Sequence, residues 1–202
     1  MPKPQTAKSD KSFRRPRNQD VRCREYLFED EVEALIRVAK TNRYGLRDST
    51  IILIGYRHGL RVGEIVPLRW AQVDWRDRLL HMQRLKHGVN TVHPLTEREV
   101  RALKQLQPEV AKLGRFPFVF ASERGGQLSN RAVQMMIAKA GVQAGLDFPV
   151  HPHMLRHACG YYLANKGHDT RLIQDYLGHR EIKHTVVYTS LAPGRFNELW
   201  PE

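Results

Sequence analysis

The segment from His151 to Tyr188 gathers side chains suited to chemistry on a phosphodiester. His153 and Arg156 stand three residues apart, so on a helix they project from one face. His179 follows the glycine that should end a second helix, and Tyr188 comes after a short connecting segment. Arginine can hold phosphate oxygens, histidine can transfer a proton and tyrosine can act as a nucleophile. The types and spacing of these residues therefore indicate a candidate site for phosphoryl transfer.

Two predicted helices would position these groups. Pro152 suits the first position of one helix, because no backbone donor is needed there, and Gly167 suits its end. Asp169 can cap a second helix that closes on Gly178. The apolar stripe of this second helix is expected to include Leu172, Ile173 and Tyr176. The candidate groups then meet at two helix ends, with no acidic cluster beside them in the sequence to bind a metal.

The composition favours a polyanionic partner. The 202 residues include 33 Lys and Arg against 21 Asp and Glu, which gives a net charge of +12, and 41% are hydrophobic. Such a chain can bury a core, and its charge favours nucleic acid over a neutral small molecule. No run suits a membrane span, and the N-terminus has no signal-peptide core. Because Cys23 and Cys159 form no disulfide framework, we expect a cytoplasmic DNA-binding or RNA-binding protein.

Residues 1–24 are predicted to form a basic, flexible N-terminal arm, since they show no apolar periodicity. Its arginines Arg14, Arg15 and Arg17 could lie on phosphates. A solvated tail that makes no such contact is an equally weighted interpretation.

The first half of the remaining chain is predicted to be helical. A helix begins at Glu29, and its apolar stripe comprises Val32, Leu35, Ile36 and Ala39. Residues 49–56 read as a buried helix. A short helix follows Gly59, with Arg61 at its start and Glu64 one turn later on the same side. This arrangement predicts an Arg61–Glu64 pair beside a break in the chain.

The middle of the chain predicts one small antiparallel sheet. Residues 79–85 and 91–95 alternate as strands, and Lys86 lies where the first strand enters the turn. A third strand is expected at 118–120. Two further helices are predicted, one after a Thr96–Glu99 capping box and one over 130–144. The fold class is therefore mainly α with a small antiparallel β-sheet, an α+β fold.

The motifs GLRVGEI, HMLRH and LGH, together with Lys86 and Tyr188, occur in an order that resembles the catalytic domain of the tyrosine recombinase (phage integrase) family. The resemblance covers about 28–196. Within the family, the strings RLKHGVNTVHPL and DTRLIQDYLGHR are most similar to the short invertases that switch fimbrial promoters. Five motifs in order are a much stronger signal than any one of them.

The resemblance implies a tyrosine recombinase fold and six catalytic positions, namely Arg61, Lys86, His153, Arg156, His179 and Tyr188. Tyr188 would be the nucleophile that forms a 3′-phosphotyrosine, and Lys86 would protonate the leaving 5′ oxygen. His153 would accept the tyrosine proton. Glu64 would support Arg61, and His157 would orient the site or pack beneath it. No cofactor, metal or ATP is expected, because arginine and lysine supply the positive charge.

The resemblance also implies the partners. Residues 25–190 would form the catalytic domain and 191–202 a segment that docks on a neighbouring subunit. The substrate would be double-stranded DNA with inverted-repeat sites, held by a homotetramer with accessory DNA-bending proteins. Inversion of a promoter-bearing segment by a cytoplasmic, nucleoid-associated bacterial protein would produce fimbrial phase variation. The predicted 130–144 helix could enter a groove of the DNA through Arg131, Gln134 and Lys139.

Other interpretations stay open at this stage. Each candidate residue, taken alone, is more often a surface charge, a helix cap or a core aromatic. His151, His153 and His157 have spacings possible for zinc, but no fourth ligand stands nearby. A DNA-binding regulator without catalysis, or an integrase or excisionase of a mobile element, would share the same scaffold.

Overall fold

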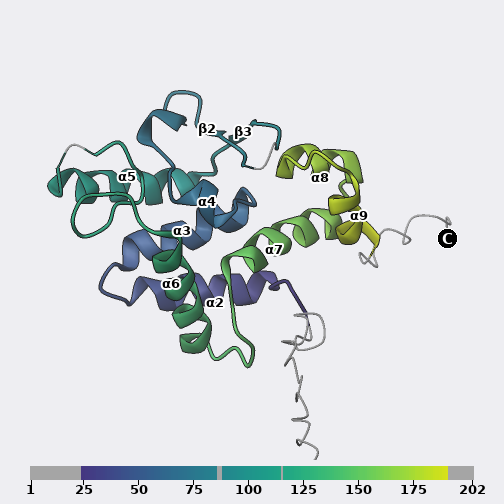
Figure 1. Cartoon of the computed structure of the whole chain (residues 1–202), viewed down its shortest axis with the longest axis horizontal. Helices are drawn as coiled ribbons and strands as arrows, with labels where there is room; N and C mark the ends of the chain where they lie inside the picture. The colour runs from purple at the N-terminus through teal and green to yellow at the C-terminus, as the bar shows by residue number, and fades with distance from the viewer. Residues whose placement is uncertain (1–23, 86–87, 115, 191–202) are drawn as a thin grey trace, which may run out of the picture.

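The computed structural model describes residues 24–85, 88–114 and 116–190 (Figure 1). Three predicted features lie outside the described residues: the arm with Arg14, Arg15 and Arg17, the hairpin residue Lys86, and the segment 191–202. The described elements are, in chain order, α2 (Glu29–Lys40), α3 (Gly45–Arg57), α4 (Val62–Ile65), η1 (Trp70–Gln72), β1 (Val73–Asp74), β2 (Leu79–Met82), β3 (Thr91–Pro94), α5 (Glu97–Lys112), α6 (Asn130–Gln143), α7 (Pro152–Asn165), α8 (Thr170–Leu177) and α9 (Lys183–Ser190). No helix in this part of the chain has the length and apolarity needed to cross a membrane.

Helix α3 forms the centre of the core. It is buried over most of its length, which is why its sequence is apolar on nearly every side. Helices α2, α5 and α7 pack around it. The predicted stripe of α2 is confirmed, since Val32, Leu35, Ile36 and Ala39 are all buried. The Thr96–Glu99 capping box at the start of α5 is also confirmed.

The sheet has the order β1-β2-β3 with antiparallel pairing, and Leu80 pairs with Val73 on one side and His93 on the other. The third strand is therefore Val73–Asp74, and the predicted strand at 118–120 is wrong. Those residues make only an isolated bridge from Phe118 to Arg69, because their backbone hydrogen-bonds to the segment around Leu68 and not to the sheet.

Strand β2 ends at Met82, three residues before its predicted end at Leu85. The reason is local. The backbone N–H of Arg84 donates to the Asn90 side chain, and that of Leu85 donates to Glu64, so neither continues the ladder. The hairpin connection is held by side chains rather than by strand pairing.

Helices α7, α8 and α9 follow one another along one side of the molecule, and α8 faces the end of the β2–β3 hairpin (Figure 1). Asp169 caps α8 by accepting from two backbone N–H groups, and Gly178 ends it in the left-handed conformation at φ 66°. Both features were predicted. Leu172 was wrongly placed in the buried stripe, since it is 51% exposed and lies on the outer side. Tyr188 lies on α9, a helix that the sequence did not reveal.

Candidate active site

A cavity of about 450 Å³ opens between the start of α4, helix α7 and the α8–α9 turn. It is lined by Arg61, Gly88, His153, Arg156, His157, Gly178, His179, Arg180, Glu181, His184 and Tyr188. Five of the six predicted catalytic residues are therefore brought together, and the sixth, Lys86, lies outside the described residues. The adjacent Leu85 backbone and Gly88 border this region.

Tyr188 is 2% exposed, because α9 packs its ring against α7. The ring fits there only over a glycine: a Cβ on Gly160 would lie 2.6 Å from Cε2 of Tyr188. The phenol hydroxyl lies 3.0 Å from Nδ1 of His157. Burial raises the pKa of Tyr188 to about 12, although Arg156 opposes the shift. The phenol is thus neutral at neutral pH and needs a proton acceptor in order to act as a nucleophile.

Two histidines of the pocket, His179 and His153, are held neutral at neutral pH. Burial, and then the charges of Arg156 and Arg61, lower the pKa of His179 to about 3. The Nδ1 atom of His179 lies 2.8 Å from the Thr185 hydroxyl, and its ring stacks on Tyr188. His153 lies at the open mouth, where desolvation by the surrounding protein, followed by the charge of the neighbouring His157, lowers its pKa to about 4.

The histidine in direct contact with the phenol is not the one predicted to accept its proton. The sequence assigned this role to His153, but the direct contact with the Tyr188 hydroxyl is made by His157. The two imidazole rings meet edge to face with centroids 4.5 Å apart. The i, i+4 spacing of His153 and His157 placed both on one face of α7, so the sequence contained the signal without ranking the two.

Arg156 is 1% exposed and is among the largest buried side chains in the described part of the protein. Its Nη1 donates to the carbonyl of Gly59 at 2.5 Å and its Nη2 to that of Leu177 at 2.9 Å, while Nε has no partner. Burial and the neighbouring charges of Arg61 and Arg84 lower the pKa of Arg156 to about 10. The guanidinium remains charged at neutral pH and retains N–H groups for an anion.

Arg61 and Glu64 form the predicted pair. Glu64 accepts from the backbone N–H of Arg61 at 3.0 Å and from its Nη1 at 2.9 Å. It also accepts from Leu85 N–H at 3.0 Å and from Arg84 Nη1 at 3.2 Å. Burial would raise the pKa of Glu64, but these hydrogen bonds and the charge of Arg84 bring it below its ordinary value. A single carboxylate thus joins Arg61, the first of the predicted catalytic arginines, to the hairpin.

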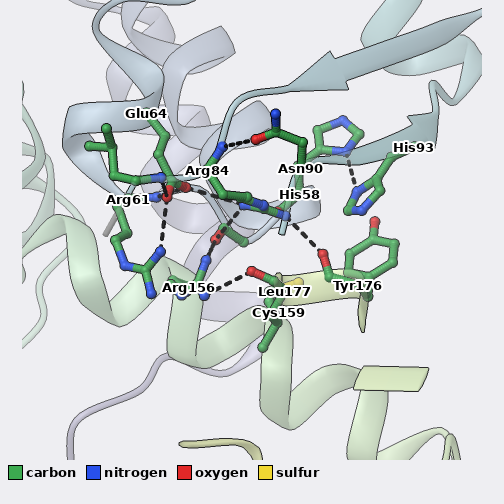
Figure 2. Close-up of polar contacts among 12 residues, drawn as sticks. His58, Arg61, Glu64, Arg84, Asn90, His93, Arg156, Cys159, Tyr176 and Leu177 are labelled. Carbon is green, nitrogen blue, oxygen red and sulfur yellow. Dashed lines mark hydrogen bonds and ion pairs between the residues drawn. The ribbon is translucent and has the colours of Figure 1, made fainter. Parts of the chain in front are cut away.

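Arg84 is the functional candidate that the sequence reasoning missed. It is fully buried in the centre of this network, between the 58–64 segment and α8 (Figure 2). Leu80, Met82 and Arg84 are all buried, so the period of two along the strand continues through the arginine. A cation at an inward position of an amphipathic strand was the available signal.

The predicted DNA-contacting residues Arg131, Gln134 and Lys139 are exposed on α6. A second hollow of about 760 Å³ joins this helix to the pocket, since Gln134, Arg61 and His153 all line it. Arg131 and Lys139 do not line it. Within 24–85, 88–114 and 116–190, no group of three or more His, Cys, Asp or Glu side chains is placed to hold a metal ion.

Comparison with known proteins gives concordant results. Residues 25–195 match the profile of the phage integrase family. The chain is 44% identical over 180 residues to the type 1 fimbriae regulatory protein FimE of Escherichia coli K12, across 88% of this chain and 91% of that protein. It is 42% identical to FimB of the same strain, across 90% and 92%. The crystal structure of XerA recombinase superposes with a TM-score of 0.77 at 27% identity, across 88% of this chain and 65% of that one.

Proposed function

Because the chain belongs to the phage integrase family of tyrosine recombinases, we propose that it cleaves and rejoins DNA through a 3′-phosphotyrosine and inverts the segment between two inverted repeats. One observation carries the proposal. The buried Tyr188 hydroxyl contacts a histidine inside a cavity that is also lined by three arginines and three further histidines.

In the cleavage step, the Tyr188 oxygen attacks the scissile phosphorus. Its proton passes to His157, which lies 3.0 Å away, with His153 beside it at the mouth. The bond from phosphorus to the 5′ oxygen breaks as the bond to tyrosine forms, and Lys86 protonates the departing oxygen. Attack by a second 5′-hydroxyl reverses these steps and releases the phenol. One phosphodiester replaces another, so no external energy source is needed.

Arg61, Arg156 and His179 would stabilise the phosphorane. Arginine suits this role, because its planar fork can engage two non-bridging oxygens while staying charged. Arg61 and Arg84 both bond to the Glu64 carboxylate, and Arg156 lies close enough to feel its charge, so this network holds three guanidinium groups against one carboxylate before DNA binds. An incoming phosphate would neutralise part of that positive charge. The attraction would be strongest in the transition state, where negative charge accumulates on the phosphorane oxygens.

The duplex would extend from the pocket toward α6. The hollow shared by Arg61, His153 and Gln134 supports this path, and Arg131 and Lys139 would contact the backbone or bases nearby. We place the basic arm, with Arg14, Arg15 and Arg17, on the phosphates of the same duplex. Four copies would hold two sites, with the 191–202 segment docking between subunits and accessory proteins bending the DNA. A cytoplasmic, nucleoid-associated location follows from this substrate.

Inversion is favoured over integration or excision because this chain matches the two fimbrial regulatory proteins over nearly their whole length. The geometry of the two sites distinguishes these outcomes. Plasmids that carry the candidate repeats in inverted or direct orientation should give inversion from the first and little product from the second. Efficient excision from direct repeats would instead indicate a mobile-element recombinase.

A covalent trap tests the catalytic proposal. Tagged wild-type protein and Tyr188→Phe are expressed in the native host and purified under denaturing conditions, and the attached DNA is sequenced. Tyr161→Phe is the matched control. The ring of Tyr161 packs on Tyr188 but does not line the cavity, so this substitution removes a neighbouring phenol hydroxyl outside the site. We expect DNA with wild type and Tyr161→Phe only. If wild type binds nicked sites but never attaches, the chain is a non-catalytic DNA-binding regulator.

A further inference from the structure

Arg84 bridges three segments that are far apart in the sequence. Its Nη2 donates to the carbonyls of His58 at 3.1 Å and Tyr176 at 2.8 Å, and its Nη1 donates to Glu64 at 3.2 Å. The side chain has no solvent exposure. Figure 2 shows the guanidinium between the strand connection and the end of α8. This arginine therefore joins the hairpin to both halves of the site.

The backbone beside Arg84 is anchored as well. Its own N–H donates to Asn90 Oδ1 at 2.9 Å, which ties the two sides of the hairpin connection together. The next N–H, that of Leu85, donates to Glu64 at 3.0 Å. The connection passes so close to α8 that a Cβ on Gly88 would lie 2.8 Å from the Gly178 carbonyl oxygen. Both ends of the connection are thus held against the pocket wall.

Filling this space with a buried guanidinium is energetically unfavourable. Desolvation of a cation costs several kcal/mol, and an apolar side chain of similar volume is often as stabilising. Here the cation also stands near two others, Arg61, which bonds to the same carboxylate, and Arg156. What an apolar residue could not provide is directional bonding to Glu64, His58 and Tyr176 at once.

We infer that Arg84 is a positioning residue that holds the β2–β3 connection against Glu64 and the end of α8, and that strand cleavage depends on this anchoring. The inference rests on the proposed function, in which Lys86, two positions along the chain from Arg84, is the acid for the leaving group. Arg84 itself touches no substrate, because it is fully enclosed. Its loss should therefore impair protonation of the leaving oxygen more than neutralisation of the phosphate.

A change of leaving group separates these effects. Nicked oligonucleotides that carry the mapped site are made with an ordinary phosphodiester or with sulfur in place of the 5′ bridging oxygen. A thiolate leaves without a proton, so the acid becomes dispensable. On the ordinary substrate, Lys86→Met should lose about 10²- to 10⁴-fold in cleavage rate and Arg84→Met about 10- to 100-fold. Both should recover most of the loss on the sulfur substrate, whereas Arg156→Lys should not.

Two further variants control for folding. Asn90 is exposed, and Asn90→Ala removes the oxygen that accepts from the Arg84 backbone N–H. This variant should show a smaller loss of cleavage rate, and the sulfur substrate should restore that loss as well. Arg78→Met removes an exposed guanidinium at the other end of β2 and should behave as wild type. Circular dichroism verifies that each variant is folded.

The outcomes distinguish the two levels of inference. If Lys86→Met recovers and neither Arg84→Met nor Asn90→Ala does, the positioning role is overturned and the proposed function stands. If Lys86→Met itself does not recover, Lys86 is not the acid and the inference falls with that assignment. Recovery of all three variants beside an unrecovered Arg156→Lys supports the inference.

Discussion

Glu64 offers the most direct test of how the site is built. The substitution Glu64→Gln keeps the size and shape of the side chain but removes its charge and one of its two acceptor oxygens. In the native protein, the carboxylate accepts four hydrogen bonds, two from Arg61, one from Arg84 and one from Leu85. The amide oxygen of glutamine can keep two of these hydrogen bonds. The amide nitrogen is itself a donor and would face the two remaining N–H groups without being able to accept from them. We therefore expect a large loss of stability.

The magnitude follows from burial. The side chains of Glu64 and Arg84 have no exposure, and removing one partner of a buried ion pair costs about 3–5 kcal/mol. For a chain of this size, each kcal/mol lowers the melting temperature by about 2–4 °C, so we expect a fall of roughly 6–20 °C. Cleavage should fall as well, because Arg61 loses the group that orients it.

Thermal and urea unfolding measure the loss, with Glu97→Gln as the control. Glu97 pairs with Arg78 at the surface, where its side chain is 62% exposed, so its loss should cost at most about 1 kcal/mol. Because the folded-state pKa of Glu64 is lowered, the advantage of wild type should be complete above about pH 4.3. It should shrink as the pH falls further. Equal melting temperatures for Glu64→Gln and Glu97→Gln would refute the reasoning.

Three other predictions follow from the geometry. Gly160→Ala should reduce covalent attachment through Tyr188 about 10- to 100-fold on denaturing gels, since the new methyl would lie 2.6 Å from the ring; unchanged attachment would contradict the packing. Thr96→Ala should lower the free energy of unfolding by about 1 kcal/mol in urea, because it removes half of the α5 capping box. In NMR titrations of the free protein, the rings of His153 and His179 should stay neutral down to about pH 5, in keeping with pKa values of about 4 and about 3. Titration near pH 6.5 would show that solvent reaches them freely.

Features set by neighbouring residues could be predicted from the sequence. Pro152 begins α7, and Asp169 and Gly178 delimit α8, because capping and left-handed turns depend on the residues at the ends themselves. The convergence of His179 with Arg156 followed from those ends. Arg61 and Tyr188 were identified through the family resemblance, which rests on the order of the motifs along the chain.

Features set by distant partners could not be predicted. Strand β1 has only two residues and exists because β2 lies beside it. Phe118 pairs with a residue far back in the chain rather than joining the sheet. The bond from Arg84 to Tyr176 spans 92 residues, and nothing local to the RLKHG string specifies it. The choice between His153 and His157 likewise depends on where α9 places the phenol.

The end of α8 shows why the pocket and the fold depend on each other. The last carbonyls of a helix have no partner within it and carry partial negative charge. In this protein they are taken by the site's own arginines: Tyr176 O accepts from Arg84 and Leu177 O accepts from Arg156 (Figure 2). The helix end thereby compensates two buried cations, and the cations satisfy the helix end. Because His179 comes two residues after Leu177, a change that detaches either arginine from α8 should displace that histidine as well.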